Sequence, residues 1–257
     1  MSTLAREDVS FVKIAELIEK DTVLAGNVLR LVNSALYGRR SAVNSVRHAV
    51  SLLGINKLRN ATLGMSVTRM WNQVHPPRGW SMAKFNLHSV GTAMLADQLS
   101  QAGAVDYAEG AFAAGLFHDL GRLLIAIGLP DEHEQITRMS SGGFSRSECE
   151  KELLGFTHAS LSGDALRVWN LPEEICTAVR HHHDPESAPV PESRIRLSSV
   201  LAAADELVNA LGYTVETSAP RSTDQAIMRI EALRLDEPLG LLLEAFNAEF
   251  EAMRAMF

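Results

Sequence analysis

Two adjacent residues of this chain, His118 and Asp119, could bind a metal or move a proton. They lie in an apolar stretch, inside one helix that we predict from Tyr107 to Ile127. A buried carboxylate is costly unless it is paired or bound to a metal. Imidazole and carboxylate together are common ligands of transition metals, and an Asp carboxylate can bridge two ions. The alternative is that both residues only cap a helix end before Gly121.

Two further polar residues are predicted to face the core from other helices. On the helix that starts at Ser81, His88 shares a face with Leu95. Asp205 points with the apolar residues of a predicted helix over Ile195 to Leu211. Buried polar groups of this kind either hydrogen-bond to their neighbours or bind a ligand.

Three histidines at predicted helix ends extend the set. Thr157 can cap a helix and places His158 in its first turn, and a later helix runs out in His182 and His183. His181, which precedes that pair, is expected to be exposed. So many ionisable groups in one core would be very costly unless they share a ligand. The candidate metal ligands are His88, His118, Asp119, His158, His182, His183 and Asp205.

Composition excludes several other classes of protein. The chain has 257 residues and a formal net charge of −7, which is unfavourable for non-specific nucleic-acid binding. No apolar run is long and uninterrupted enough to span a bilayer, and the first residues lack a secretory core. Cys149 and Cys176 are the only cysteines, which argues against a disulfide framework or a thiolate zinc site. We therefore expect a cytoplasmic protein that does not cross or bind a membrane.

Helical periodicity runs through the chain, and no window shows the alternation that is typical of a strand. The sequence therefore predicts an all-α fold. The segment from His75 to Gly79 contains two prolines and a glycine, which cannot continue a helix. We expect an N-terminal helical lobe over residues 1–76 and a second helical lobe with a C-terminal extension over residues 77–257. The groove between the lobes would be a surface for ligands or partners.

Two elements have two interpretations each. The short helices on either side of Gly54 could form a helix-turn-helix, but the acidic chain favours a plain helical bundle. The last predicted helix carries an apolar stripe from Leu239 to Phe257. We expect this stripe to pack on the body of the protein, and a homodimer contact is the alternative.

The ordered set of histidines and aspartates resembles the HD superfamily of metal-dependent phosphohydrolases. More specifically, the chain is similar to the HD-related output domain (HDOD) family over roughly residues 10–210. The additional matches are LRLVNSALYG at 29–38, AVSLLG at 49–54, GLFHDLGR at 115–122 and WNLP at 169–172. The resemblance implies an all-helical fold and a role in bacterial signalling.

The resemblance also implies two metal positions that share one carboxylate. One ion would be held by His88, His118, Asp119 and Asp205, and a second by Asp119, His158, His182 and His183. The sequence does not choose among Zn, Mn, Fe and Ni, because imidazole and carboxylate suit all four metals.

One motif of the related HD-GYP phosphodiesterases, which cleave cyclic di-GMP, is missing. Those enzymes carry Gly-Tyr-Pro a few residues beyond a His-His-Glu sequence. Here His182-His183-Asp184 is followed by PESAP, and Arg122 stands where those enzymes have lysine. HDOD proteins are generally regarded as output or scaffold domains without demonstrated catalysis.

The favoured function is therefore a non-catalytic signal-transduction module that binds a partner protein or a nucleotide. The alternative is a metal-dependent phosphohydrolase acting on a nucleotide or a cyclic dinucleotide. In that case His118, Asp119 and Arg122 are the catalytic candidates, and Arg122 would contact the phosphate.

Overall fold

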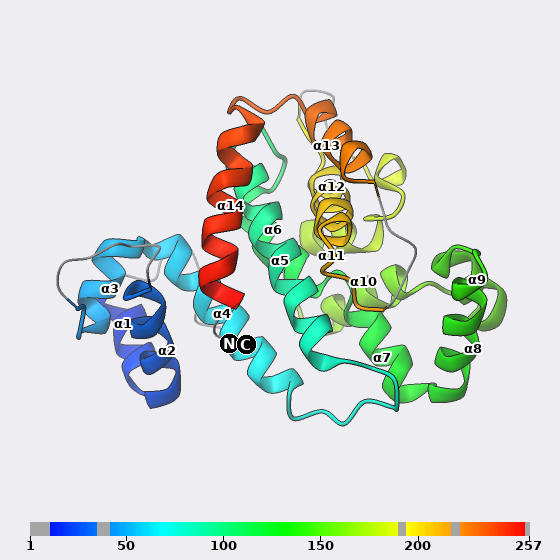
Figure 1. Cartoon of the computed structure of the whole chain (residues 1–257), viewed down its shortest axis with the longest axis horizontal. Helices are drawn as coiled ribbons and strands as arrows, with labels where there is room; N and C mark the ends of the chain where they lie inside the picture. Colours follow the sequence, from blue (N-terminus) through cyan, green and yellow to red (C-terminus); the bar gives the residue numbers. More distant parts are fainter. Residues whose placement is uncertain (1–10, 35–41, 190–193, 217–221, 255–257) are drawn as a thin grey trace. The chain divides into compact units, whose positions relative to one another are not determined.

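A computed structural model describes residues 11–34, 42–189, 194–216 and 222–254. These ranges consist of helices and their connections (Figure 1), with no strand among them beyond one isolated bridge between Val105 and Ile195. The predicted all-α fold is thus confirmed. The chain divides into two compact units, residues 1–74 with 247–257, and residues 75–246.

The first unit is a small bundle in which α3 contacts α1, α2 and α4. The Asp21 side chain caps α2 by accepting hydrogen bonds from two backbone amides, and Ser45 caps α3. Residues 35–38 of the LRLVNSALYG motif lie outside the described ranges. The helices are α1 (Phe11–Glu19), α2 (Thr22–Val32), α3 (Val46–Leu53), α4 (Ile55–Trp71) and the end of α14 (Leu239–Arg254).

The second unit is built around α5, which packs against α6 and α12, while α10 packs against α7 and α11. Helices α8 and α9 lie side by side as a pair (Figure 1). The elements are α5 (Met82–Gln101), η2 (Ala108–Gly110), α6 (Ala111–Phe117), α7 (Leu120–Gly128), α8 (Pro130–Ser141), α9 (Arg146–Leu154), α10 (His158–Val168), α11 (Glu173–Arg180), η3 (Pro185–Ser187), α12 (Leu197–Ala210), α13 (Thr223–Ala232) and the start of α14.

The prediction of one continuous helix around His118 and Asp119 is wrong. Helix α6 ends at Phe117 and α7 starts at Leu120, so the two residues form the turn between them. Close packing against α10 accompanies this break, because the Gly121 amide donates a 2.7 Å hydrogen bond to the Ser162 hydroxyl. The turn places both metal-ligand candidates at the junction of two helices.

The same stretch is apolar and long enough, by composition, to be considered as a membrane span. Most of the stretch Ala108–Gly128 is, however, buried inside the protein. Because the segment is also interrupted at His118 and Asp119, we interpret it as the core of the second unit.

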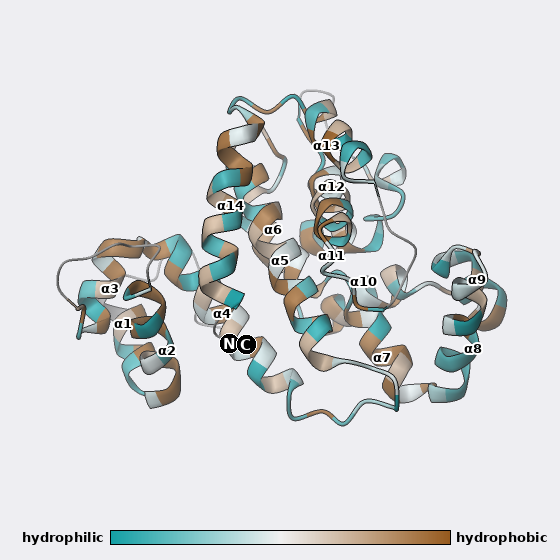
Figure 2. Cartoon of the chain, in the orientation of Figure 1, coloured by the Kyte–Doolittle hydropathy of each residue, from teal (hydrophilic) through white to brown (hydrophobic). Residues whose placement is uncertain are grey.

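The apolar stripe of α14 is buried within the chain, as the first interpretation expected. Figure 2 shows hydrophobic and hydrophilic residues mixed along this helix. Leu242, Phe246, Phe250 and Met253 are each less than 9% exposed. Phe257, the last residue of the predicted stripe, lies outside the described residues.

Gly121 provides a test of how tightly the turn is held. A Cβ at this position would lie 2.1 Å from the His158 carbonyl oxygen. We expect Gly121→Ala to lower the free energy of unfolding by roughly 1–3 kcal/mol, because backbone atoms would have to move apart. Urea denaturation followed by circular dichroism measures the change.

Gly128 at the end of the same helix is the matched control, because a Cβ there meets nothing within 4 Å. Gly128→Ala should be neutral or slightly stabilising, since alanine favours helix more than glycine does. Equal effects of the two substitutions would contradict the packing argument.

Candidate metal centre

The second unit brings all seven predicted side chains together. Helix α5 supplies His88, α10 supplies His158 and α12 supplies Asp205. The turn after α6 supplies His118 and Asp119, and the turn beyond α11 supplies His182 and His183. Six of the seven are buried. His183 is exposed, but its Nε2 atom faces His158, so its ring points into the cluster.

A first group gathers around the Nε2 atom of His88. This atom lies 3.1 Å from Asp205 Oδ1 and 3.2 Å from His118 Nε2. The Asp119 Oδ2 atom is 3.5 Å from it and 3.8 Å from His118 Nε2. Four potential ligand atoms therefore converge on one point in the core.

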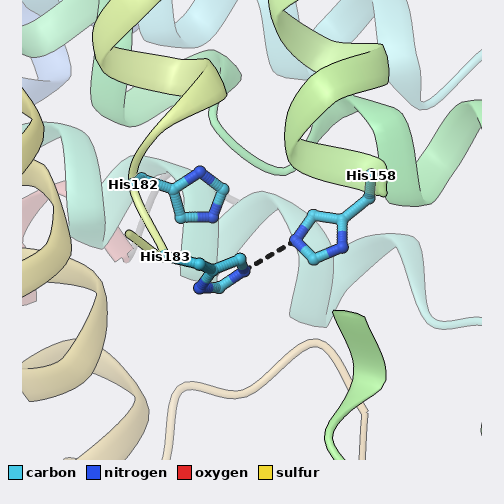
Figure 3. A group of neighbouring side chains, drawn as sticks. All are labelled: His158, His182 and His183. Atoms are coloured by element: carbon cyan, nitrogen blue, oxygen red, sulfur yellow. Dashed lines mark hydrogen bonds between the residues drawn. The ribbon is translucent and has the colours of Figure 1, made fainter. Parts of the chain in front are cut away.

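A second group consists of His158, His182 and His183, whose rings face one another (Figure 3). The Nε2 atoms of His158 and His183 are 2.9 Å apart. The other carboxylate oxygen of Asp119, Oδ1, lies 3.3 Å from His158 Nε2. Asp119 thus presents one oxygen to each group, which is the arrangement of a bridging carboxylate.

A backbone carbonyl holds the outer nitrogen of three buried histidines of the cluster. The Nδ1 atoms of His88, His118 and His182 lie 2.7–2.8 Å from the carbonyl oxygens of Tyr213, Gly115 and Val179. A carbonyl oxygen can only accept, so each Nδ1 carries a proton. In the neutral ring the Nε2 atom then offers a lone pair, and the hydrogen bond fixes its direction.

These lone pairs need a cation. The Nε2 atoms of His88 and His118 face each other at 3.2 Å, so a proton or a metal ion has to lie near them. The Nε2 atom of His182 is buried and has no hydrogen-bond partner among the described residues. An unsatisfied buried acceptor that points into a cluster of histidines and carboxylates fits a metal ligand.

The pKa values of the buried groups also indicate that the cluster attracts a cation. Burial opposes it, but hydrogen bonds to Asp119 and Asp205 raise the pKa of His88 to about 9. Burial, followed by the charges of His118 and His158, lowers the pKa of His182 to about 4. Burial also acts to raise the pKa of Asp119, but Arg122 and His118 hold it well below its ordinary value. The carboxylates therefore stay charged and attract a cation.

Comparison with known proteins identifies the family of the chain. The HDOD domain model matches residues 1–185, which is more than half of the chain. The chain belongs to the HDOD family.

A curated relative is similar in sequence, and two solved structures share this fold. An uncharacterized protein from Treponema pallidum is 25% identical over 95% of this chain, which spans 46% of that relative's length. An HDOD domain protein of unknown function from Geobacter sulfurreducens has 24% identity and a TM-score of 0.78, covering 99% of this chain and 87% of its own. A proposed phosphohydrolase from Shewanella amazonensis has 24% identity and a TM-score of 0.75, with coverage of 99% and 90%.

Two predicted residues of this HDOD protein have surroundings that bear on their proposed roles. Arg122 is 13% exposed and donates to Asp119 Oδ2 at 2.9 Å, so it contacts a candidate ligand instead of facing solvent. His181 is half-buried, and its Nδ1 lies 2.6 Å from the Ser187 hydroxyl, outside the cluster.

Glu150, which is fully buried on α9, is not among the residues predicted from the sequence. Its Oε2 atom accepts hydrogen bonds from both the backbone amide and the Nδ1 of His158, each at 2.7 Å. A carboxylate behind a metal-binding histidine fixes the ring and increases its basicity. Nothing in the polar helix around Glu150 distinguishes it from exposed neighbours, so only its i,i+4 spacing to Arg146 could have drawn attention.

Glu150→Gln tests this support of the HDOD cluster. The amide removes the buried charge that holds His158 Nδ1 and Arg146 Nε. We expect the free energy of unfolding of metal-free protein to fall by roughly 1–3 kcal/mol, as measured by urea denaturation in chelator. Glu152→Gln on the same helix is the control, because Glu152 is exposed. A Glu150→Gln protein as stable as the control would contradict the assignment.

Proposed function

We propose that this HDOD protein is a metal-binding signal-transduction module that does not catalyse a reaction. The observation that carries the metal assignment is the buried, unpartnered Nε2 of His182 at the centre of the histidine cluster. If the cluster were held only by hydrogen bonds among its own side chains, one of them would donate to this atom. None of the described residues does so.

Charge balance also favours cations. Asp119, Asp205, Glu150 and Glu216 face the guanidinium groups of Arg122 and Arg146 in and around the cluster. With neutral imidazoles, these groups have a formal net charge of −2. One divalent ion neutralises this charge, and a second would leave an excess of positive charge for an anion such as phosphate or hydroxide.

The two groups would hold ions of different accessibility. His88, His118, Asp119 and Asp205 form a closed set, since all four side chains are buried. The set of Asp119, His158, His182 and His183 reaches the surface at His183. A bound Zn, Mn, Fe or Ni ion supplies Lewis acidity toward water or a phosphate oxygen.

The surroundings of Arg122 favour a module over an enzyme. Its guanidinium pairs with Asp119 and Glu216, so it is not free to clamp a substrate phosphate. The sequence after His183 also lacks the Gly-Tyr-Pro motif of the related phosphodiesterases. The surface around His183 would then serve to bind a signalling protein or a nucleotide.

A metal-dependent phosphohydrolase is the second candidate. The intact ligand set and the exposed His183 favour it, because hydrolysis needs an ion that a substrate can reach. The two buried free cysteines suit a reducing cytoplasm under either proposal.

Metal content is the first test. We expect purified protein to contain a divalent transition metal, and His118→Ala and Asp119→Ala to lose at least one ion, because each removes a ligand from the closed group. Elemental analysis by mass spectrometry measures this. His75→Ala is the control, since His75 is exposed and distant in sequence from the cluster. Wild-type protein that binds no transition metal at saturating concentration would end the metal proposal.

Turnover is the second test. Metal-loaded protein should not hydrolyse cyclic dinucleotides, nucleotides or a generic phosphodiester above the rate of buffer with metal. Product formation by liquid chromatography measures the rate. Hydrolysis that disappears in His118→Ala and Asp119→Ala, with the fold intact by circular dichroism, would replace the module with the phosphohydrolase.

A further inference from the structure

A closed ring of charged side chains joins the bridging carboxylate to a histidine of the second group. From Asp119 the ring passes to Arg122 at 2.9 Å, and from Arg122 Nη2 to Glu216 Oε2 at 3.4 Å. Glu216 also pairs with Arg146. We call this set the charge ring, and its members are Asp119, Arg122, Glu216, Arg146, Glu150 and His158.

The second half of the ring returns to the metal centre. Arg146 Nε donates to Glu150 Oε1 at 3.0 Å, and Glu150 Oε2 lies 2.7 Å from His158 Nδ1. His158 Nε2 then faces Asp119 Oδ1 at 3.3 Å. Each charged group therefore touches a group of opposite sign or a histidine on both sides.

The side chains of the charge ring are buried or largely buried, so their ion pairs are only weakly screened by solvent. The Glu150 side chain is 0% exposed, and those of Arg122 and Arg146 are 13% and 12% exposed. Glu216 is 20% exposed, so it is the most accessible of the four outer members. Solvent screens such pairs much less than it screens surface ion pairs.

Glu216 is the only acceptor seen between the two guanidinium groups within the described residues. Burial, followed by the charge of Arg122, lowers the pKa of Arg146, which means that the two cations repel. A carboxylate between them offsets this repulsion and holds both arginines in place. Arg122 then stays on Asp119, and Arg146 stays on Glu150.

The segment that carries Glu216 also contacts the first metal group. The carbonyl oxygen of Tyr213, three residues earlier, lies 2.8 Å from His88 Nδ1. Residues 213–216, which follow α12, therefore support ligands of both groups from outside. No feature of their sequence marks Glu216 as a functional residue.

We infer that Glu216 is a positioning residue for the metal centre. It acts through Arg122 on the Asp119 carboxylate, and through Arg146 and Glu150 on the His158 ring. This inference rests on the proposed metal binding. Its consequence is that metal affinity depends on a side chain that contacts none of the seven candidate ligands.

The test compares Glu216→Gln with Glu134→Gln. Glu134 is an exposed partner of Arg138 on α8, so it controls for loss of one carboxylate and one ion pair. Affinity for Mn²⁺ or Zn²⁺ is measured by competition with a chelator, and melting temperature is measured with and without metal. We expect Glu216→Gln to bind about tenfold more weakly and to gain less melting temperature from metal. Glu134→Gln should match wild type in both measurements.

Each outcome separates the positioning role from the metal proposal. Wild type that binds no metal would overturn both. If wild type and Glu216→Gln bind metal with equal affinity, only the role of Glu216 is overturned. The same holds if Glu216→Gln lowers the melting temperature equally with and without metal. If Glu216→Gln does not fold, Glu216→Asp takes its place, with an expected loss of about threefold. Wild-type affinity in that folded variant would overturn the role.

Discussion

The buried Asp119 carboxylate is the group on which the rest of the second unit depends. A charge with 3% side-chain exposure is stable only if its surroundings compensate for lost hydration. Here one oxygen faces His88 and the Arg122 guanidinium, and the other faces His158. Three helices, α5, α7 and α10, bring these partners to one carboxylate in the turn before α7.

The backbone also helps to arrange the groups that surround the buried Asp119 carboxylate. The break between α6 and α7 places two candidate ligands at a helix junction, and Gly121 lets α7 approach the backbone of α10. Backbone carbonyls of Gly115 in α6, of Val179 in α11 and of Tyr213 after α12 then orient three histidine rings. These hydrogen bonds orient the histidine rings without any metal, so the centre is preorganised.

The choice between a non-catalytic signalling module and a phosphohydrolase depends on what the Arg122 guanidinium contacts. A guanidinium near two metal positions suits a phosphate clamp, yet in this HDOD protein it pairs with Asp119 and Glu216. The charge that could recognise a substrate instead supports the ligand shell. The exposed His183 leaves one group open to a binding partner, and an open metal position is also what hydrolysis requires.

Helical periodicity alone placed His88 and Asp205 on core-facing surfaces, because side chains repeat every 3.6 residues on a helix. The all-α fold and the cap at Thr157 followed from local patterns in the same way. Only the tertiary structure decided the helix break at His118, since packing against α10 overrides the apolar run. It also decided the roles of Glu150 and Glu216. Partners brought together by folding are separated in the chain, and no local pattern records which acidic side chain becomes buried beside an arginine.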